Sequence, residues 1–352
     1  MPARYTMEMA ARRVAPSQEA SSLSTLRPVH HLSIAALLVS HCLAVHAGAP
    51  APSAPALPAL QAACSADARP DAALPNVQVR AMPAAADDLP YIEAQSRATN
   101  ARVRIYHDPD LADAAASKAA CFMGMLDLLP PLVPEARAQR TWSPMVITRR
   151  ANYIPPKRDG ELRWVNEFDA GGWSPRAIDF LVSVMPHEET HLVQGDRRRD
   201  LPRWFEEGHA DWVGLQVSAM VSPGSARSKR EQRARDFRSL AIAHLGAWGG
   251  LQVKPEAVER QLSPEDRARR AQDPSYNPPG PFRFTREDLV EDNGNEAGRY
   301  GAALALFEGL EARHGRPAVQ AWASAVLAST GESDIPALAL QVLGEDIAPL
   351  LR

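Results

Sequence analysis

The first half of the chain alternates apolar and polar residues over short segments, as strands of a small sheet do. Residues 102–106 read Arg-Val-Arg-Ile-Tyr, and this alternation predicts a half-buried strand. The short segments Met-Val-Ile-Thr at 145–148 and Leu-Arg-Trp-Val at 162–165 predict two more strands. Between the first two strands, residues 111–129 form a longer apolar stretch that ends at a Pro-Pro pair, which predicts a helix.

The second half carries apolar residues at helical spacing, with clear helix-start signals. Ser174-Pro175 offers a capping hydroxyl and a first-turn proline. Gly195 suits the end of that helix, and Asp200-Leu201-Pro202 suits the start of the next. Further helices are expected at 225–238, 300–313, 317–327 and 336–343. The pattern predicts an α+β protein with a small mixed β-sheet lobe (about 91–173), two central helices (about 174–220) and a helical lobe (about 221–352).

Residues 1–47 have the pattern of a signal peptide. Arg12, Arg13 and Arg27 precede an apolar run at 32–45, and Val45-His46-Ala47 places small residues at the positions that signal peptidase reads. The run of about 14 residues is too short to span a bilayer comfortably. We therefore expect an exported protein, periplasmic or secreted, with no stable membrane insertion after the leader is removed. The alternative is a leader that stays attached as a membrane anchor.

Composition and cysteine usage agree with an exported globular protein. Residues 48–90 are rich in Ala and Pro and read as a linker, which leaves 91–352 as the folded domain. Removing 1–47, which hold four Arg and two Glu, changes the net charge from −3 to −5, so a nucleic-acid partner is not expected. Cys64 and Cys121 remain as an even pair, compatible with one disulfide or with two buried thiols.

The segment His187-Glu188-Glu189-Thr190-His191 reads His-Glu-x-x-His. On a helix, residues four apart share one face, so His187 and His191 can offer two imidazole nitrogens to one Zn²⁺ ion. Glu188 can then take the proton of a zinc-bound water. Pro186 directly precedes the motif, so the helix is expected either to kink there or to begin there.

A catalytic zinc needs a third protein ligand, and Glu207 on the next helix is the candidate. Asp211 lies four residues later on the same face, where it can accept the second N–H of a metal-bound histidine. His209 lies near the opposite side of that helix, which favours packing over ligation. The six basic residues between 225 and 238 favour a solvated helix face over a binding patch.

The run Trp204-Phe205-Glu206-Glu207-Gly208-His209-Ala210 resembles the Trp-x-x-Glu-Gly-x-Ala segment of gluzincin (peptidase MA-like) zinc metallopeptidases, a group that includes thermolysin relatives. The resemblance covers about 185–214, with a weaker match at 298–321. It implies a thermolysin-like core with the zinc-binding helix between the two lobes, and Glu207, rather than Glu206, as the third ligand. It also implies that Tyr300 donates to the oxyanion and that an edge strand, with 162–165 as the candidate, binds the substrate backbone.

The predicted function is therefore an exported zinc metallopeptidase that takes a peptide or protein substrate. Its site consists of three ligands, His187, His191 and Glu207, and of Glu188 as the general base. Two alternatives stay open. The chain can be a non-catalytic zinc-containing envelope binding protein, or a zinc hydrolase of a non-peptide amide or ester.

Overall fold

The computed structural model describes residues 56–68, 74–85, 88–136, 141–149, 158, 161–165, 168–169, 172–198, 200–240, 243–329 and 334–352. The signal peptide predicted for 1–47 lies outside these residues. The described part is an α+β protein, as the sequence pattern predicts.

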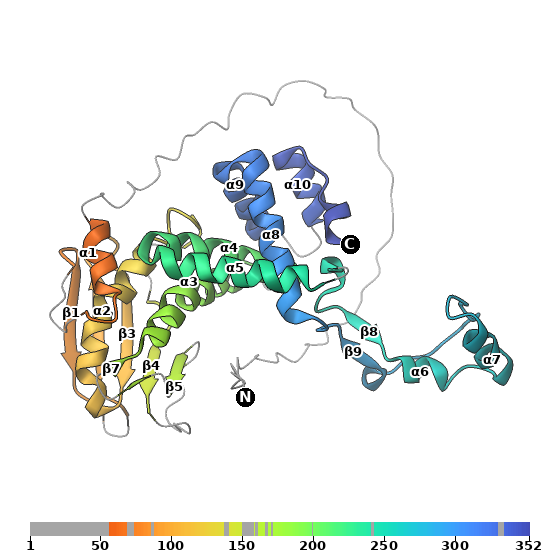
Figure 1. The fold of residues 1–352 in the computed structure, drawn as a ribbon, viewed down its shortest axis with the longest axis horizontal. Helices are drawn as coiled ribbons and strands as arrows, with labels where there is room; N and C mark the ends of the chain where they lie inside the picture. Colours follow the sequence, from red (N-terminus) through yellow and green to blue (C-terminus); the bar gives the residue numbers. More distant parts are fainter. Residues whose placement is uncertain are drawn as a thin grey trace, which may run out of the picture. The chain divides into compact units, whose positions relative to one another are not determined.

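A five-stranded mixed sheet is the main β structure, in the order β1-β2-β3-β4-β5 (Figure 1). Its strands are β1 (Val77–Met82), β2 (Tyr91–Ser96), β3 (Arg102–His107), β4 (Met145–Thr148) and β5 (Leu162–Val165). The first three strands pair antiparallel, whereas β3, β4 and β5 pair parallel. The three strands expected from the sequence are β3, β4 and β5, and β5 is the last strand in the order of the sheet.

Helix α2 (Ala112–Asp127) covers the antiparallel end of the sheet, where it packs against β1, β2 and β3, and α1 (Ala56–Ala63) packs on α2. A disulfide between Cys64 and Cys121 ties the end of α1 to α2. Leu60, Leu74 and Val77 belong to the same apolar core as the sheet. The prediction of a linker throughout 48–90 is therefore wrong from α1 onward, because apolar side chains in this Ala- and Pro-rich segment are buried.

The helical part follows the sheet in sequence and forms the rest of the core. Its long helices are α3 (Pro175–Arg197), α4 (Arg203–Val221), α5 (Pro223–Arg238), α8 (Glu296–His314), α9 (Arg316–Ala328) and α10 (Ile335–Leu343). Helix α4 packs against α3, α5 and α8, so it lies at the centre of the group. Helix α9 packs between α8 and α10. These bounds agree with the sequence expectations to within a few residues.

Helix α3 begins where the sequence predicts and continues through Pro186. The hydroxyl of Ser174 caps it by accepting the backbone N–H of Ala177 at 3.0 Å. A proline inside a helix removes the donor to the carbonyl four residues earlier. Here that carbonyl, on Val182, accepts a hydrogen bond from Ser218 Oγ of α4 instead. The helix therefore does not begin at Pro186, because a neighbouring helix supplies the lost hydrogen bond.

The expected end of α3 and the expected start of α4 both differ from the structure. Helix α3 runs on to Arg197, so Gly195 is an interior helical residue and not a cap. Pro202 occupies the N-cap position of α4 without a side-chain hydrogen bond, while Asp200 pairs with Arg198. Gly195 and Asp200 are compatible with helix caps, but neither residue requires one. These local signals therefore predicted boundaries that differ from the structure.

Two glycines let α4 approach its neighbours closely. A Cβ added to Gly214 would lie 3.1 Å from the backbone nitrogen of His187 on α3. A Cβ added to Gly208 would lie 3.0 Å from the ring of Phe307 on α8. Helix α4 is thus held tightly between α3 and α8, and the first contact is at the His-Glu-x-x-His segment.

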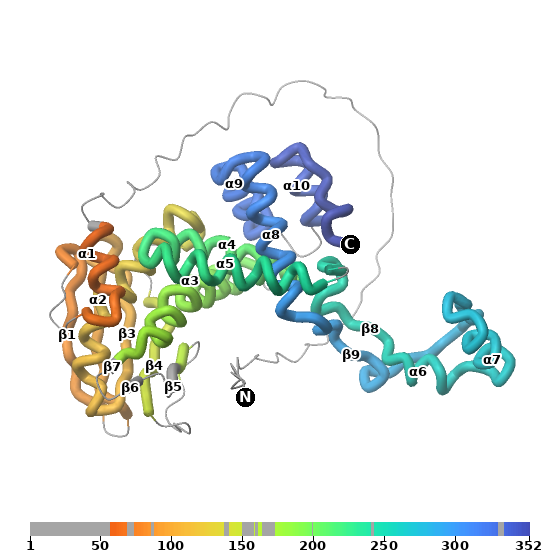
Figure 2. Tube along the Cα trace, in the orientation of Figure 1, coloured from red at the N-terminus to blue at the C-terminus, as the bar shows by residue number. Residues whose placement is uncertain are grey.

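Residues 251–291 lie between α5 and α8 in the sequence, and the two ends of this segment pair to form a short β-ribbon. Strands β8 (Leu251–Val253) and β9 (Leu289–Glu291) run side by side and antiparallel, although about 35 residues separate them (Figure 2). Between them lie α6 (Pro255–Glu259) and α7 (Pro264–Gln272), followed by the expected loop at 273–281. A second small ribbon, β6 (Phe168–Asp169) with β7 (Gly172–Trp173), precedes α3.

Short 3-10 turns complete the described structure: η1 (Pro109–Leu111), η2 (Leu245–Ala247), η3 (Arg286–Asp288) and η4 (Ala348–Leu351). Within the described residues, no helix is both long enough and apolar enough to span a membrane.

Candidate metal centre

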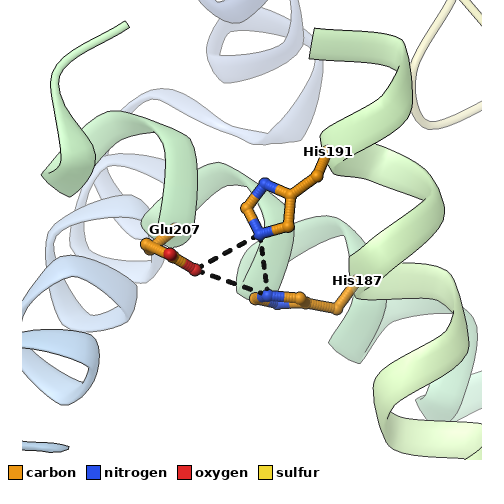
Figure 3. A group of neighbouring side chains, drawn as sticks. All are labelled: His187, His191 and Glu207. Carbon is orange, nitrogen blue, oxygen red and sulfur yellow. Dashed lines mark hydrogen bonds and ion pairs between the residues drawn. The ribbon is translucent and has the colours of Figure 1, made fainter. Parts of the chain in front are cut away.

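Three side chains from α3 and α4 converge on one point (Figure 3). His187 and His191 come from successive turns of α3, and Glu207 reaches them from α4. The two Nε2 atoms lie 3.0 Å apart. Glu207 Oε2 lies 3.5 Å from Nε2 of His187 and 3.3 Å from Nε2 of His191. The three residues that the sequence predicts as metal ligands are thus brought together.

The spacing of these atoms fits a tetrahedral metal. Bonds of about 2.0–2.2 Å at tetrahedral angles separate two ligand atoms by about 3.3–3.5 Å. Both contacts of Glu207 Oε2 fall in this range, and the two nitrogens are slightly closer. Glu207 Oε2 is also buried, and its close polar neighbours are the two histidine nitrogens. A buried carboxylate oxygen between two imidazole nitrogens is a donor set that a cation would satisfy.

Asp211 lies behind His187, as the sequence predicts. Its Oδ1 is 2.9 Å from His187 Nδ1, the ring nitrogen that faces away from Glu207. In the metal-free protein, burial alone would lower the pKa of His187, but Asp211 and then Glu207 outweigh it and raise the pKa to about 10. Asp211 therefore orients the ring so that Nε2 faces the other two donors.

His191 has a different partner, which sequence reasoning missed. Its Nδ1 lies 2.7 Å from Oε1 of Gln194, one turn further along α3. The amide nitrogen of Gln194 contacts the carbonyl of Glu206 at 2.9 Å and Nδ1 of His209 at 3.2 Å. Since these contacts use the amide as a donor, Oε1 is left to accept from His191. The spacing of three residues on one helix was the signal that could have identified Gln194.

His209 packs within an aromatic cluster, as expected from its position on α4. Its ring stacks on Phe205 and lies against Phe307 and Trp212. Burial, and then the nearby His191, lower the pKa of His209 to about 3. This histidine is therefore neutral at neutral pH, and its contact with Gln194 supports the site without a ligand role.

The carboxylate of Glu207 uses its two oxygens differently. Oε2 faces the histidines, while Oε1 lies 3.8 Å from Nε of Arg203, one turn earlier on α4. Burial alone would raise the pKa of Glu207, but the two histidines hold it well below its usual range. Glu207 is thus an anion at neutral pH. Its neighbour Glu206 has a raised pKa, chiefly because of burial, and does not belong to the three-residue cluster.

Glu188 follows His187 on α3 and is half-buried. Its carboxylate is close enough to His187 to help raise the pKa of that imidazole. Among the residues that the structure describes, no hydrogen bond or ion pair engages this carboxylate. It therefore remains available to a molecule that enters the site.

Tyr300, which lies within the weaker sequence match at 298–321, is on α8 beside the cluster. Burial and the carboxylate of Glu207 raise the pKa of its phenol far above the ordinary value, and Arg203 acts in the opposite direction. Its ring packs against Trp248, with centroids 5.1 Å apart. The phenol therefore stays protonated and can donate a hydrogen bond near Glu207.

Arg233 is the second residue that sequence reasoning missed. Its Nε lies 2.7 Å from Oδ2 of Asp211, and its guanidinium lies over the ring of Tyr300, 4.4 Å from the centroid. The basic run of α5 is thus not uniformly solvated. A single arginine in a charged run carries no local signal, because its partners lie on α4 and α8.

The sequence matches no protein-family model, and neither the curated proteins nor the solved structures contain a significant match.

Proposed function

We propose that this protein is a zinc-dependent metallopeptidase that hydrolyses peptide bonds. One observation carries the proposal. His187, His191 and Glu207 converge at tetrahedral spacing, with the free carboxylate of Glu188 next to them in the sequence. Two histidines and one glutamate are the ligands of a well-known class of catalytic zinc sites.

The ligand number favours catalysis over a purely structural zinc. Structural sites are usually closed by four protein ligands, whereas catalytic sites use three and keep one position for water or substrate. Among the described residues, the cluster offers three donors of the His, Cys, Asp or Glu type. This supports an enzyme over the alternative of an envelope protein that binds zinc without chemistry.

Bound Zn²⁺ would polarise the scissile carbonyl and make water a better nucleophile at neutral pH. The remaining steps belong to the protein. Glu188 would accept a proton from the attacking water at its carboxylate and then deliver it to the leaving amine. Tyr300, held protonated beside Glu207, would donate a hydrogen bond to the oxygen that becomes negative.

The substrate would be an extended peptide or protein segment. Strand β5 is the last strand in the order of the five-stranded sheet, so one of its sides has no strand partner among the residues that the structure describes. Such an edge can bind a peptide backbone through N–H and C=O groups, with little selection among side chains. This edge supports a peptide substrate over a small non-peptide amide or ester.

An exported location goes with this function. The disulfide between Cys64 and Cys121 joins two buried cysteines, one just after α1 and one in α2. Such bonds persist in oxidising compartments and are rare in the cytosol. Together with the leader pattern at 1–47, the disulfide supports a periplasmic or secreted enzyme.

The experiment compares zinc-loaded protein with its Glu188→Gln variant on a diverse peptide library, with products read by mass spectrometry. The parent should cleave peptides, and the variant should retain zinc but lose about 10²–10⁴-fold in turnover, the usual contribution of a general base. Full activity in the variant would contradict the role of Glu188. No cleavage by either protein would favour the zinc-binding alternative.

The ligand assignment has its own test, independent of substrate. Glu207→Ala should weaken zinc binding, whereas Glu206→Ala should leave it nearly unchanged, because only Glu207 belongs to the three-residue cluster. Competition with a coloured chelator measures both affinities. Equal loss in the two variants would remove Glu207 as a specific ligand.

A further inference from the structure

Asp211 is shared between a candidate metal ligand and an arginine. One carboxylate oxygen lies 2.9 Å from His187 Nδ1, and the other lies 2.7 Å from Arg233 Nε. The Asp211 side chain is 4% exposed and that of Arg233 is 12% exposed, so water contributes little to this arrangement. A buried carboxylate needs a partner for each oxygen, and the guanidinium contacts the oxygen that His187 does not.

The same guanidinium contacts the other side of the centre. Its carbon lies 4.4 Å from the centroid of the Tyr300 ring, a distance typical of a cation–π contact. Tyr300 in turn lies beside Glu207, and its ring packs on Trp248. Arg233 therefore contacts both Asp211, which lies behind His187, and Tyr300, which lies beside Glu207.

The position of Arg233 within α5 makes this double contact possible. Gly301 of α8 faces α5, and a Cβ there would lie 2.2 Å from the backbone oxygen of Arg233. This glycine allows α5 and α8 to approach closely at that turn. By contrast, the other arginines at 227, 235 and 238 on the same helix are exposed.

We propose that Arg233 is a positioning residue of the metal centre, which holds Asp211 against His187 and Tyr300 beside Glu207. The donor atoms are thereby arranged before a metal enters. The inference rests on the metal site of the proposed function and not on peptide hydrolysis. Groups that orient metal ligands typically change metal affinity by about 10–100-fold when they are replaced.

The test compares Arg233→Gln with a matched control, Arg230→Gln. Arg230 lies one turn earlier on α5 and pairs with Glu308 of α8 at 2.8 Å, but both side chains are 40% exposed. The control thus removes an α5–α8 ion pair without touching the metal centre. Zinc affinity is measured by chelator competition, and the visible spectrum of the Co²⁺-loaded protein reports the ligand geometry.

Arg233→Gln should bind zinc about 10–100-fold more weakly and should change the Co²⁺ spectrum, while Arg230→Gln should match the parent in both. Parent-like affinity and spectrum in Arg233→Gln would overturn the inference. So would an equal loss in Arg230→Gln, because the effect would then come from helix packing.

A third variant keeps the test decisive if Arg233→Gln does not fold. Arg233→Lys retains a positive charge for Asp211 but lacks the planar group over Tyr300, so an intermediate affinity is expected. Parent-like affinity in Arg233→Lys would then overturn the inference.

The test also separates this inference from the proposed enzyme. A parent protein that binds no zinc would overturn both. A parent that binds zinc but cuts no peptide would remove only the peptidase, and the affinities would still decide the role of Arg233.

Discussion

The hydroxyl of Ser218 on α4 donates a hydrogen bond to the carbonyl of Val182 on α3. Pro186 has no N–H, so this carbonyl lacks its usual helical donor. The same hydroxyl lies 2.8 Å from the carbonyl of Gly214 in its own helix. Since the carbonyl of Val182 lies just before the His-Glu-x-x-His segment, the contact holds α3 and α4 together where the three candidate ligands converge.

Removal of the Ser218 hydroxyl should lower the free energy of unfolding more when Pro186 is present than when it is replaced. Ser218→Ala leaves the carbonyl of Val182 unsatisfied, which should lower the free energy of unfolding by about 1–3 kcal/mol. In a Pro186→Ala background the backbone N–H at position 186 returns, so the same change should cost less. Urea unfolding of the four metal-free proteins measures this coupling. An equal cost in both backgrounds would show that the hydroxyl does not compensate for the proline.

Gln194 should influence metal affinity through His191. Gln194→Leu removes the acceptor that lies 2.7 Å from His191 Nδ1, and it should weaken zinc binding about tenfold. Gln216→Leu is the control, since the Gln216 side chain is buried without a hydrogen-bond partner among the described residues. Chelator competition on both variants provides the comparison. Unchanged affinity in Gln194→Leu would mean that packing alone orients His191.

The close approach at Gly214 should be essential for the metal centre. Gly214→Ala places a Cβ 3.1 Å from the backbone of His187, which should destabilise the fold by about 1–3 kcal/mol and weaken zinc binding. Gly195→Ala is the matched control on α3, because a Cβ there meets no atom within 4 Å. It should stabilise the protein by up to about 1 kcal/mol, as alanine favours helices. Thermal unfolding and zinc titration of both variants check these directions.

The metal-free protein should become less stable in alkaline solution because of His187. Its folded-state pKa is raised to about 10, against an ordinary value of about 6.5. The stabilisation from protonated His187 is therefore complete below about pH 6.5 and is lost as the pH rises through about 10. Urea unfolding of chelator-treated protein between pH 6.5 and 10 should show this decline. The His187→Gln variant should not show the loss of stability that comes from deprotonation of His187. An identical decline in the variant would exclude His187 as the source.

Metal binding should release the same proton. A metal-bound imidazole must be deprotonated at the binding nitrogen, so zinc must displace a proton from the cluster below about pH 10. Zinc affinity should therefore rise with pH from 6.5 toward 9. Calorimetry in buffers of different ionisation enthalpy counts the protons released. A count of zero at pH 7 would show that His187 is already neutral in the metal-free protein.

The sequence by itself determined the local part of the centre. His187 and His191 are four residues apart, so any helix through them places both rings on one face. Glu207 and Asp211 have the same spacing on the following helix. The strands at 102–106, 145–148 and 162–165 were also predictable, because a two-residue repeat or a short apolar run is a local signal.

Only the tertiary structure decided what surrounds those candidate ligands. Ser218, Arg233 and Gly214 act through residues on other helices, and no spacing along the chain specifies which helix faces them. The folded role of α1 and β1 was hidden for the same reason, since Ala and Pro residues look like a linker until a disulfide and a buried core hold them. Local spacing fixes which side chains share a face, but packing between distant segments fixes what each face meets.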